Sequence, residues 1–114
     1  NDPFTGEKRF HHGLDISASR GTAIFATADG KIISAGKLGN YGNTIKIKHG
    51  HGYNTFYGHL HKILVKRGQD IKRGDLIGQV GNTGRSTASH LHYEVHYLGT
   101  PQDPEHYFLS RKMR

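Results

Sequence analysis

The chain has no cysteine and no long hydrophobic run. Without thiols, zinc fingers, thiol catalysis and disulfide frameworks are excluded. No stretch of its 114 residues has the character of a signal-peptide core, and none is long enough and apolar enough to cross a bilayer. Because the chain starts at Asn1 rather than Met, we expect a domain excised from a longer protein whose targeting segment lies elsewhere.

Hydrophobic residues are also scarce, at 33% of the chain. Tyr, Phe, Ile, Leu and Val nevertheless recur in short blocks, which argues against disorder. No shift in composition marks a linker, so the sequence predicts a single domain over residues 1–114 with one modest core.

Acidic residues are outnumbered, with nine Asp and Glu against sixteen Lys and Arg and a net charge of +7. This balance favours an anionic polymer as partner, and nucleic acid, cell-wall polymer and acidic lipid all qualify. Lysines such as Lys31, Lys37, Lys46 and Lys48 are scattered along presumptive strands, so an ordinary solvated face explains them equally well. The charge therefore gives no reason to expect nucleic-acid binding.

What the chain does have is glycine every few residues, with short β-branched and aromatic blocks between. This pattern predicts an all-β, compact antiparallel fold with little helix. We expect strands at residues 22–26, 31–38, 44–49, 53–59, 76–80 and 90–97, with connections at 39–43 and 50–52. Only 104–109 invites a short helical turn, capped by Asp103.

Residues 65–78 repeat a glycine and an aliphatic residue at a six-residue step. This rhythm suits tight turns between very short strands and resembles the biotinyl and lipoyl carrier barrels. No lysine stands at a hairpin tip in an attachment motif. The repeat is therefore interpreted as architecture, not as a carrier site.

The most informative segment is 89–97, whose odd and even positions differ in chemistry. Successive strand side chains point to opposite faces. One face would carry His90, His92, Glu94 and His96, and the other Leu91, Tyr93, Val95 and Tyr97. The second set suits a core, and the first suits a polar site.

Far upstream, His11 and Asp15 stand four positions apart and offer ligand types that zinc takes from proteins. In an extended segment His11 shares a face with Asp15, whereas His12 points the other way. A surface histidine beside a turn-forming aspartate is the plain alternative. Combined with the late histidines, however, the pair predicts a metal site with catalytic histidines beside it.

The chain has ten histidines, so several other positions compete. His49 and His51 flank a glycine in an expected turn, where a solvent-facing polar role is favoured. His59 ends the expected strand 53–59 and would project toward whatever His90 faces, whereas His61 has no such placement. Glu94 and His96 would orient ligands or line the rim. Tyr41 and Tyr57 are candidates to border the cleft, with turn and core roles equally open.

Three motifs in this order resemble the lysostaphin/LytM-type zinc endopeptidases, which cut peptidoglycan cross-bridges. They are His11-His12-Gly13-Leu14-Asp15, Tyr57-Gly58-His59-Leu60, and the Gly- and Ser/Thr-rich segment 81–89 that leads into His90-Leu91-His92. The resemblance runs from about Gly6 to Phe108 and covers nearly the whole chain. It implies a barrel-sandwich fold of the duplicated hybrid motif type.

The resemblance further implies that His11, Asp15 and His92 hold Zn²⁺, while His59 and His90 act beside it. Spacing alone does not make this division, since both histidines of a His-x-His pair can reach one ion. A catalytic zinc keeps an open position for water and lowers the pKa of that water from about 15.7 toward about 7. The two outer histidines would orient the water and transfer protons.

The family likeness makes peptidoglycan stem peptides and cross-bridges the expected partners, with other domains of the parent protein as further candidates. A periplasmic or extracellular, cell-wall-associated location follows from that substrate. Residues 1–6 look like those of Gram-negative members that cut D-Ala to diaminopimelate links, which we favour over Gly-Gly bonds.

Two other functions remain open. A non-catalytic member of the fold would bind and regulate a cell-wall amidase, but such members usually lose the metal residues that this chain keeps. A sugar-phosphotransferase carrier of related barrel topology would relay phosphate between two histidines and would need neither His11 nor Asp15. Metal content and hydrolysis of purified murein distinguish the three.

Overall fold

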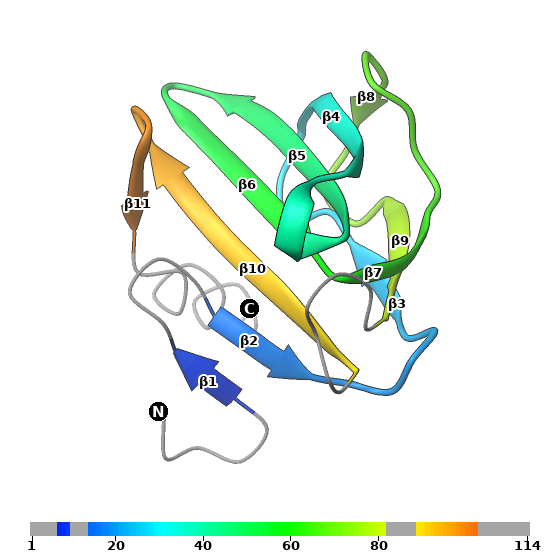
Figure 1. Ribbon diagram of the computed structural model, residues 1–114. Coiled ribbons are helices and arrows are strands. Elements are labelled where there is room, and N and C mark those ends of the chain that lie inside the picture. The colour runs from blue at the N-terminus through cyan, green and yellow to red at the C-terminus, as the bar shows by residue number, and fades with distance from the viewer. Residues whose placement is uncertain (1–6, 10–13, 82–88, 103–114) are drawn as a thin grey trace.

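The protein is an all-β fold of two antiparallel sheets (Figure 1), as the glycine and β-branched pattern predicts. The computed structural model describes residues 7–9, 14–81 and 89–102. Its strands are β1 (Glu7–Arg9), β2 (Leu14–Ser17), β3 (Ala23–Phe25), β4 (Gly30–Lys37), β5 (Asn43–Gly50), β6 (Tyr53–Gly58), β7 (Leu60–Ile63), β8 (Asp70–Ile71), β9 (Leu76–Val80), β10 (His90–Tyr97) and β11 (Thr100–Gln102). One 3₁₀ turn, η1 (Gly39–Tyr41), joins β4 to β5.

The larger sheet has eight strands in the order β1-β2-β10-β6-β5-β4-β8, with β11 paired to β10. The smaller sheet has the order β3-β9-β7. Strand β10 lies between β2, near the N-terminus, and β6, from the middle of the chain (Figure 1). Segments distant in sequence therefore meet on β10, which is where the late histidines lie.

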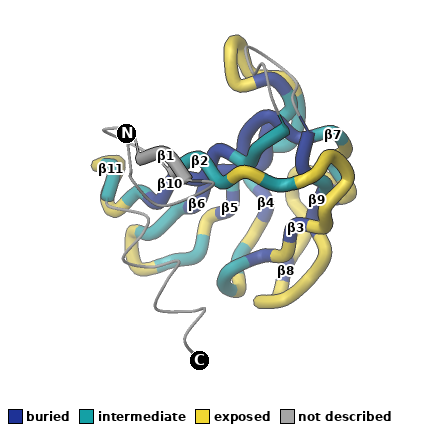
Figure 2. Tube along the Cα trace, turned by 90° about the horizontal axis from the view of Figure 1, so that it is seen from below, coloured by how far each residue is buried: buried dark blue, intermediate teal, exposed yellow. Residues whose placement is uncertain are grey.

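One hydrophobic core joins the two sheets. The buried stretches, dark blue in Figure 2, lie toward the middle of the molecule, while exposed yellow segments lie mainly in peripheral loops. The larger sheet contributes Ile32, Ile45, Ile47, Tyr57, Tyr93 and Val95, and the smaller one contributes Ile24, Leu60, Ile77 and Val80. The predicted apolar face of 90–97 is confirmed at Tyr93 and Val95, which are 2% and 3% exposed.

The six-residue repeat is structural, as predicted. Val65, Ile71 and Ile77 are all buried in the core at that spacing. Between them Gly68 and Gly74 turn the chain with φ of 91° and 89°, a conformation that glycine adopts without steric cost.

All six predicted strands are present, as β3, β4, β5, β6, β9 and β10, and no end differs from the prediction by more than one residue. The strands β1, β2, β7 and β11 were not predicted, and β8 lies within the repeat at 65–78, where very short strands were expected. The expected turn at 104–109 lies outside the described residues. Within the described ranges, no helix has the length and apolar character needed to span a membrane.

Candidate functional site

The site begins with the pairing of β2 and β10. Their register sets Asp15 directly opposite His92, although 77 positions separate them in the chain. On the other side of β10, Gly58 of β6 pairs with His92. Directly opposed residues of an antiparallel pair share one face of the sheet. The late His-x-His motif and the aspartate of the first motif therefore meet on one surface.

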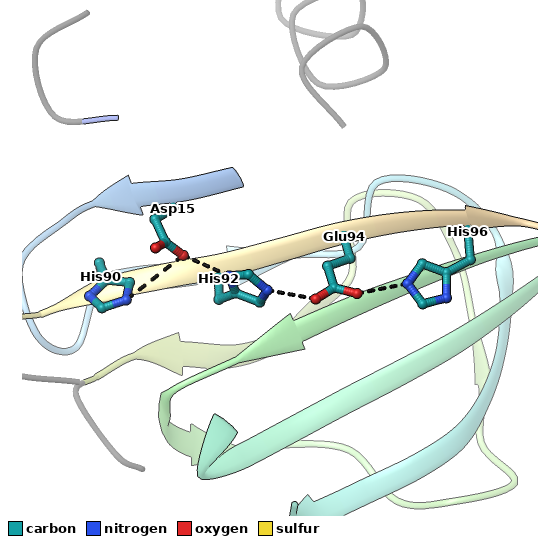
Figure 3. A network of polar contacts seen from close by, with 5 residues as sticks. All are labelled: Asp15, His90, His92, Glu94 and His96. Carbon is teal, nitrogen blue, oxygen red and sulfur yellow. Dashed lines mark hydrogen bonds and ion pairs between the residues drawn. The ribbon is translucent and has the colours of Figure 1, made fainter. Parts of the chain in front are cut away.

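Four side chains form a continuous polar network along β10 (Figure 3). His92 Nδ1 lies 2.7 Å from Asp15 Oδ1, and His92 Nε2 lies 2.6 Å from Glu94 Oε2. The other carboxylate oxygen of Glu94 accepts a hydrogen bond from His96 Nε2 at 2.7 Å. Both ring nitrogens of His92 thus face carboxylates, and Glu94 fixes two imidazoles at once.

Charge and burial make the centre of this network a place for a cation. Burial alone would lower the pKa of His92, but hydrogen bonds to Asp15 and Glu94 and the charges of these carboxylates raise it from 6.5 to about 9. For Glu94 burial acts in the opposite direction and would raise the pKa. Hydrogen bonds from His92 and His96, together with their charges, nevertheless lower the pKa of Glu94 below its usual value. Two carboxylates therefore favour a positive charge beside or on the His92 ring, which is 7% exposed.

His90 lies at the edge of the network. Its Nε2 is 3.8 Å from Asp15 Oδ1, too far for a direct hydrogen bond but close enough for attraction when the ring is protonated (Figure 3). In the register of β10 and β2, His90 pairs with Ser17. The backbone N–H of His90 donates a hydrogen bond to Gly81 O at 3.1 Å.

His59 reaches the same place from the end of β6. Its backbone has φ of 62°, in the left-handed region that side chains other than glycine seldom adopt. The backbone N–H of His59 donates to Tyr41 O at 2.7 Å, and Asn43 Nδ2 donates to the next carbonyl, Leu60 O, at 3.0 Å. This turn sets the His59 ring 5.0 Å from the His90 ring, between centroids, so the predicted convergence is confirmed.

One wall of the site is aromatic. The ring of Tyr41, from η1, lies 5.3 Å from the ring of His92 and 5.1 Å from that of Phe56, which it meets edge-on. Burial together with the charges of Glu94 and Asp15 raises the pKa of Tyr41. Its phenol is therefore protonated at neutral pH and can donate a hydrogen bond above the polar network.

The structure brings together four of the five predicted site residues: Asp15, His59, His90 and His92. The fifth, His11, lies outside the described residues, so its role as a ligand stays a prediction. Of the two candidate cleft residues, Tyr41 borders the site. Tyr57 does not, because it is 1% exposed in the core and its hydroxyl lies 3.1 Å from Thr27 Oγ1.

Three other described histidines, His49, His51 and His61, are placed away from this centre. The prediction of a solvent-facing His49 was wrong, because its ring bridges Asp29 O at 2.6 Å and Thr55 Oγ1 at 2.7 Å. His51 is exposed in the β5–β6 turn, as expected. His61 Nδ1 lies 3.2 Å from Arg20 Nη2, a surface contact.

Sequence reasoning missed Phe56, which belongs to the polar face although its residue type suggests core. Its register partner Glu94 supplies the signal, since residues paired across β6 and β10 must share a face. Only long-range pairing reveals this, and no local pattern carries it.

The comparison that decides the family is a match to the model for peptidase family M23 over residues 9–104. The chain belongs to peptidase family M23. The matched span contains all five predicted site residues.

Three curated relatives of this M23 domain are informative. It is 45% identical over 96 residues to DD-carboxypeptidase/endopeptidase Mpg of Neisseria meningitidis, covering 84% of this chain and 22% of the relative. It is 43% identical over 99 residues to peptidoglycan DD-endopeptidase ShyA of Vibrio cholerae, covering 87% and 23%. It is also 40% identical over 111 residues to murein hydrolase activator NlpD of Escherichia coli, covering 96% and 29%. The chain thus spans about a quarter of the length of these relatives.

Two solved structures share the fold. The catalytic domain of lysostaphin from Staphylococcus simulans superposes with a TM-score of 0.81 at 37% identity, covering 88% of this chain and 80% of that one. A zinc-containing peptidase from Vibrio cholerae superposes with a TM-score of 0.79 at 45% identity, covering 82% and 29%. These likenesses confirm the predicted fold type and the lysostaphin-type resemblance, and the family together with this zinc-containing structural neighbour indicates a metal.

The donor set fits a divalent cation. An aspartate oxygen and an imidazole nitrogen lie 2.7 Å apart, and the far nitrogen of the same imidazole bonds a carboxylate, the usual arrangement behind a metal-bound histidine. Among the described residues, no group of three or more His, Asp or Glu is placed to hold an ion unaided. A third ligand must then come from elsewhere, as His11 would.

Proposed function

We propose that this M23 domain is a zinc-dependent endopeptidase that hydrolyses amide bonds in peptidoglycan cross-links. The observation that carries the proposal is the Asp15–His92–Glu94 network with the His59–His90 pair beside it. A cation position flanked by two imidazoles that lie outside the proposed metal set suits amide hydrolysis, which needs both an activated water and a proton for the leaving amine.

His11, Asp15 and His92 would hold the zinc. When bound, the ion supplies a Lewis acid that polarises the scissile carbonyl and acidifies a water molecule. Glu94 accepts a hydrogen bond from His92 Nε2, which fixes the ring so that Nδ1 faces Asp15. This hydrogen bond also strengthens the imidazole as a ligand.

His59 and His90 would handle protons and orient the water. Their rings lie 5.0 Å apart, and His59 is only 9% exposed, so its ring is largely shielded from solvent. An imidazole titrates close to neutral pH and can accept a proton from water or return one to the departing amine. The ring of Tyr41 lies 6.3 Å from that of His59, between centroids, and its hydroxyl would donate to a developing oxyanion.

The favoured bond is D-Ala to diaminopimelate, in preference to Gly-Gly. Support comes from the names of two relatives, Mpg and ShyA, which describe DD-specific enzymes, and from the likeness of residues 1–6 to Gram-negative members. Such a substrate makes a periplasmic or extracellular site of action part of the proposal.

Digestion of purified murein tests the proposal. The zinc-loaded protein should convert cross-linked muropeptides to monomers, as measured by chromatography and mass spectrometry of the products. A chelator should stop the reaction, and zinc should restore it. Intact cross-links after incubation with the zinc-loaded protein would contradict the assignment.

The NlpD match favours one second candidate, activation of a murein amidase. An activator would leave cross-links intact and would increase release of stem peptides by an added amidase. Asp15, His59, His90 and His92 all remain in this chain and converge, which binding alone would not require.

A further inference from the structure

The sheet face that carries the metal residues continues, across two strands, into a pair of lysines. Lys46 of β5 pairs with Phe56 of β6, which pairs with Glu94 of β10. One row further along, Lys48 pairs with Asn54, which pairs with His96. Residues in register share a face, so both lysines project from the surface that holds the polar network.

Burial along β5 confirms that orientation. Ile45 and Ile47 are fully buried in the core, whereas Lys46 is half-buried and Lys48 is exposed. The alternation puts the lysines on the face opposite the core.

Neither ammonium group is neutralised within the described part of the chain. Lys31, the neighbour of Lys48 on β4, has an ion pair with Asp70 at 3.7 Å, but no such pair joins Lys46 or Lys48 to a described carboxylate. Glu94 is committed to His92 and His96, and the ring of Phe56 stands between it and Lys46. Two positive charges are therefore available to an external anion.

The spacing fits a peptide strand. Neighbouring strands are about 4.8 Å apart and residues rise about 3.3 Å along a strand, so the Cα atoms of Lys46 and Lys48 lie roughly 12 and 16 Å from that of His92. An extended peptide advances about 3.3–3.6 Å per residue, so the lysines would meet groups about three to five residues from a bond held at His92.

We propose that Lys46 and Lys48 form a carboxylate-binding subsite that selects the acidic peptide strand of the substrate. The inference rests on the proposed function, which supplies the peptide, and deepens it by naming two specificity-determining residues. The subsite would favour stems with free carboxylates over stems in which these groups are amidated.

The test compares two charge-matched double variants, Lys46→Gln with Lys48→Gln, and Lys62→Gln with Lys66→Gln. Lys62 and Lys66 are exposed lysines outside the face that carries the site, so both variants lose the same charge. The substrates are a synthetic cross-linked stem-peptide dimer with free carboxylates and the same dimer with its carboxylates amidated. Thermal melting establishes that each variant is folded.

We expect the first double variant to raise KM about three- to tenfold for the carboxylate dimer and to leave kcat unchanged. This loss of affinity lies between the usual contribution of an exposed ion pair and that of a charge-assisted hydrogen bond. The amidated dimer and the second variant should show no change. An equal loss on both dimers, an equal loss in the second variant, or a loss confined to kcat would overturn the subsite.

A binding measurement separates this inference from the proposed function. In a His90→Ala background, fluorescence anisotropy reports the Kd of labelled dimers without turnover. Selectivity for the carboxylate dimer that disappears with Lys46→Gln and Lys48→Gln supports the subsite even when wild-type protein hydrolyses neither dimer. Absence of selectivity, or displacement by glycan strands stripped of peptide, would overturn it.

Discussion

At the scale of single residues, the centre of the site is His92, because both of its ring nitrogens contact carboxylates. Asp15 and Glu94 have different roles although both are acidic. Asp15 lies beside the nitrogen that would bind a cation, and Glu94 holds the opposite nitrogen. In the proposed site, Asp15 would bind the ion on one side of the imidazole and Glu94 would orient the ring from the other side.

Replacing Glu94 by Gln tests that separation. The amide keeps the size of the side chain but loses the charge that stabilises His92, so zinc affinity should fall about 10- to 100-fold. Competition with a chromogenic chelator measures the affinity. The matched control is Asp70→Asn, which removes a carboxylate from an exposed position on β8, at the far edge of the larger sheet, and should leave affinity unaltered. An unchanged affinity in Glu94→Gln would contradict the orienting role.

The metal set and the proton-transfer pair should respond differently to substitution. His59→Ala and His90→Ala should retain zinc while turnover falls on the order of a hundred- to ten-thousand-fold, because each removes a general acid–base group. Asp15→Asn and His92→Ala should lose zinc as well as activity. Elemental analysis of the purified variants measures zinc content, and a murein hydrolysis assay measures turnover.

Loss of metal in His59→Ala would show that the division of roles is wrong. His61→Ala is the control, since His61 contacts Arg20 outside the site and its removal should affect neither quantity.

At the scale of elements, the position of His90 depends on a close approach between chain segments. Gly81 forms an isolated bridge with His90, and a Cβ at Gly81 would lie 2.7 Å from the Cα of His61. At Gly58 the nearest contacts of an added Cβ are ordinary, at 3.4–3.6 Å. These two glycines of the site therefore differ in how much space surrounds them.

Gly81→Ala should lower the free energy of unfolding by about 1–3 kcal/mol, the usual cost of forcing backbone apart in a packed region. Gly58→Ala should change it by less than about 1 kcal/mol because no contact is too short. Chemical denaturation of both variants supplies the comparison. Equal free energies of unfolding for Gly81→Ala and Gly58→Ala would mean that the backbone near Gly81 shifts at little cost, which would contradict the close approach.

The sequence predicts elements well where one strand is long and alternates clearly. Residues 90–97 alternate through eight positions, and β10 has those bounds. Strands such as β8, with two residues, carry too short a pattern to be recognised and exist because a neighbouring strand supplies hydrogen bonds. The same reason explains why the residue types predicted a shared site for Asp15 and the late histidines but the division of roles needed a family likeness: the contact between Asp15 and His92 depends on register between distant strands.

At the scale of the whole molecule, the lysine pair and the polar network of the candidate site lie on the same face of the larger sheet. The net charge of +7 attracts an anionic polymer, and the face with the polar network also presents Lys46 and Lys48. The apolar residues of β10 are directed to the other side, into the core. Under the proposed function, such an arrangement would concentrate an acidic polymer at the face that carries the site.

Binding to purified sacculi should therefore weaken as salt rises. Screening shortens the Debye length from about 10 Å at 0.1 M to about 3 Å at 1 M, so the bound fraction in a co-sedimentation assay should fall several-fold over this range. Zinc content should stay constant, because the metal is held by short-range bonds. Salt-independent binding would show that the positive charge plays no part in capturing the polymer.

The central claim is that one zinc ion binds at Asp15 and His92, and crystallographic anomalous scattering measured on both sides of the zinc absorption edge tests it most directly. The account predicts a single strong peak in contact with an Asp15 carboxylate oxygen and His92 Nδ1, with Glu94 still bonded to His92 Nε2. A zinc-loaded crystal with no peak between Asp15 and His92, or with its peak at the His59–His90 pair, would contradict it.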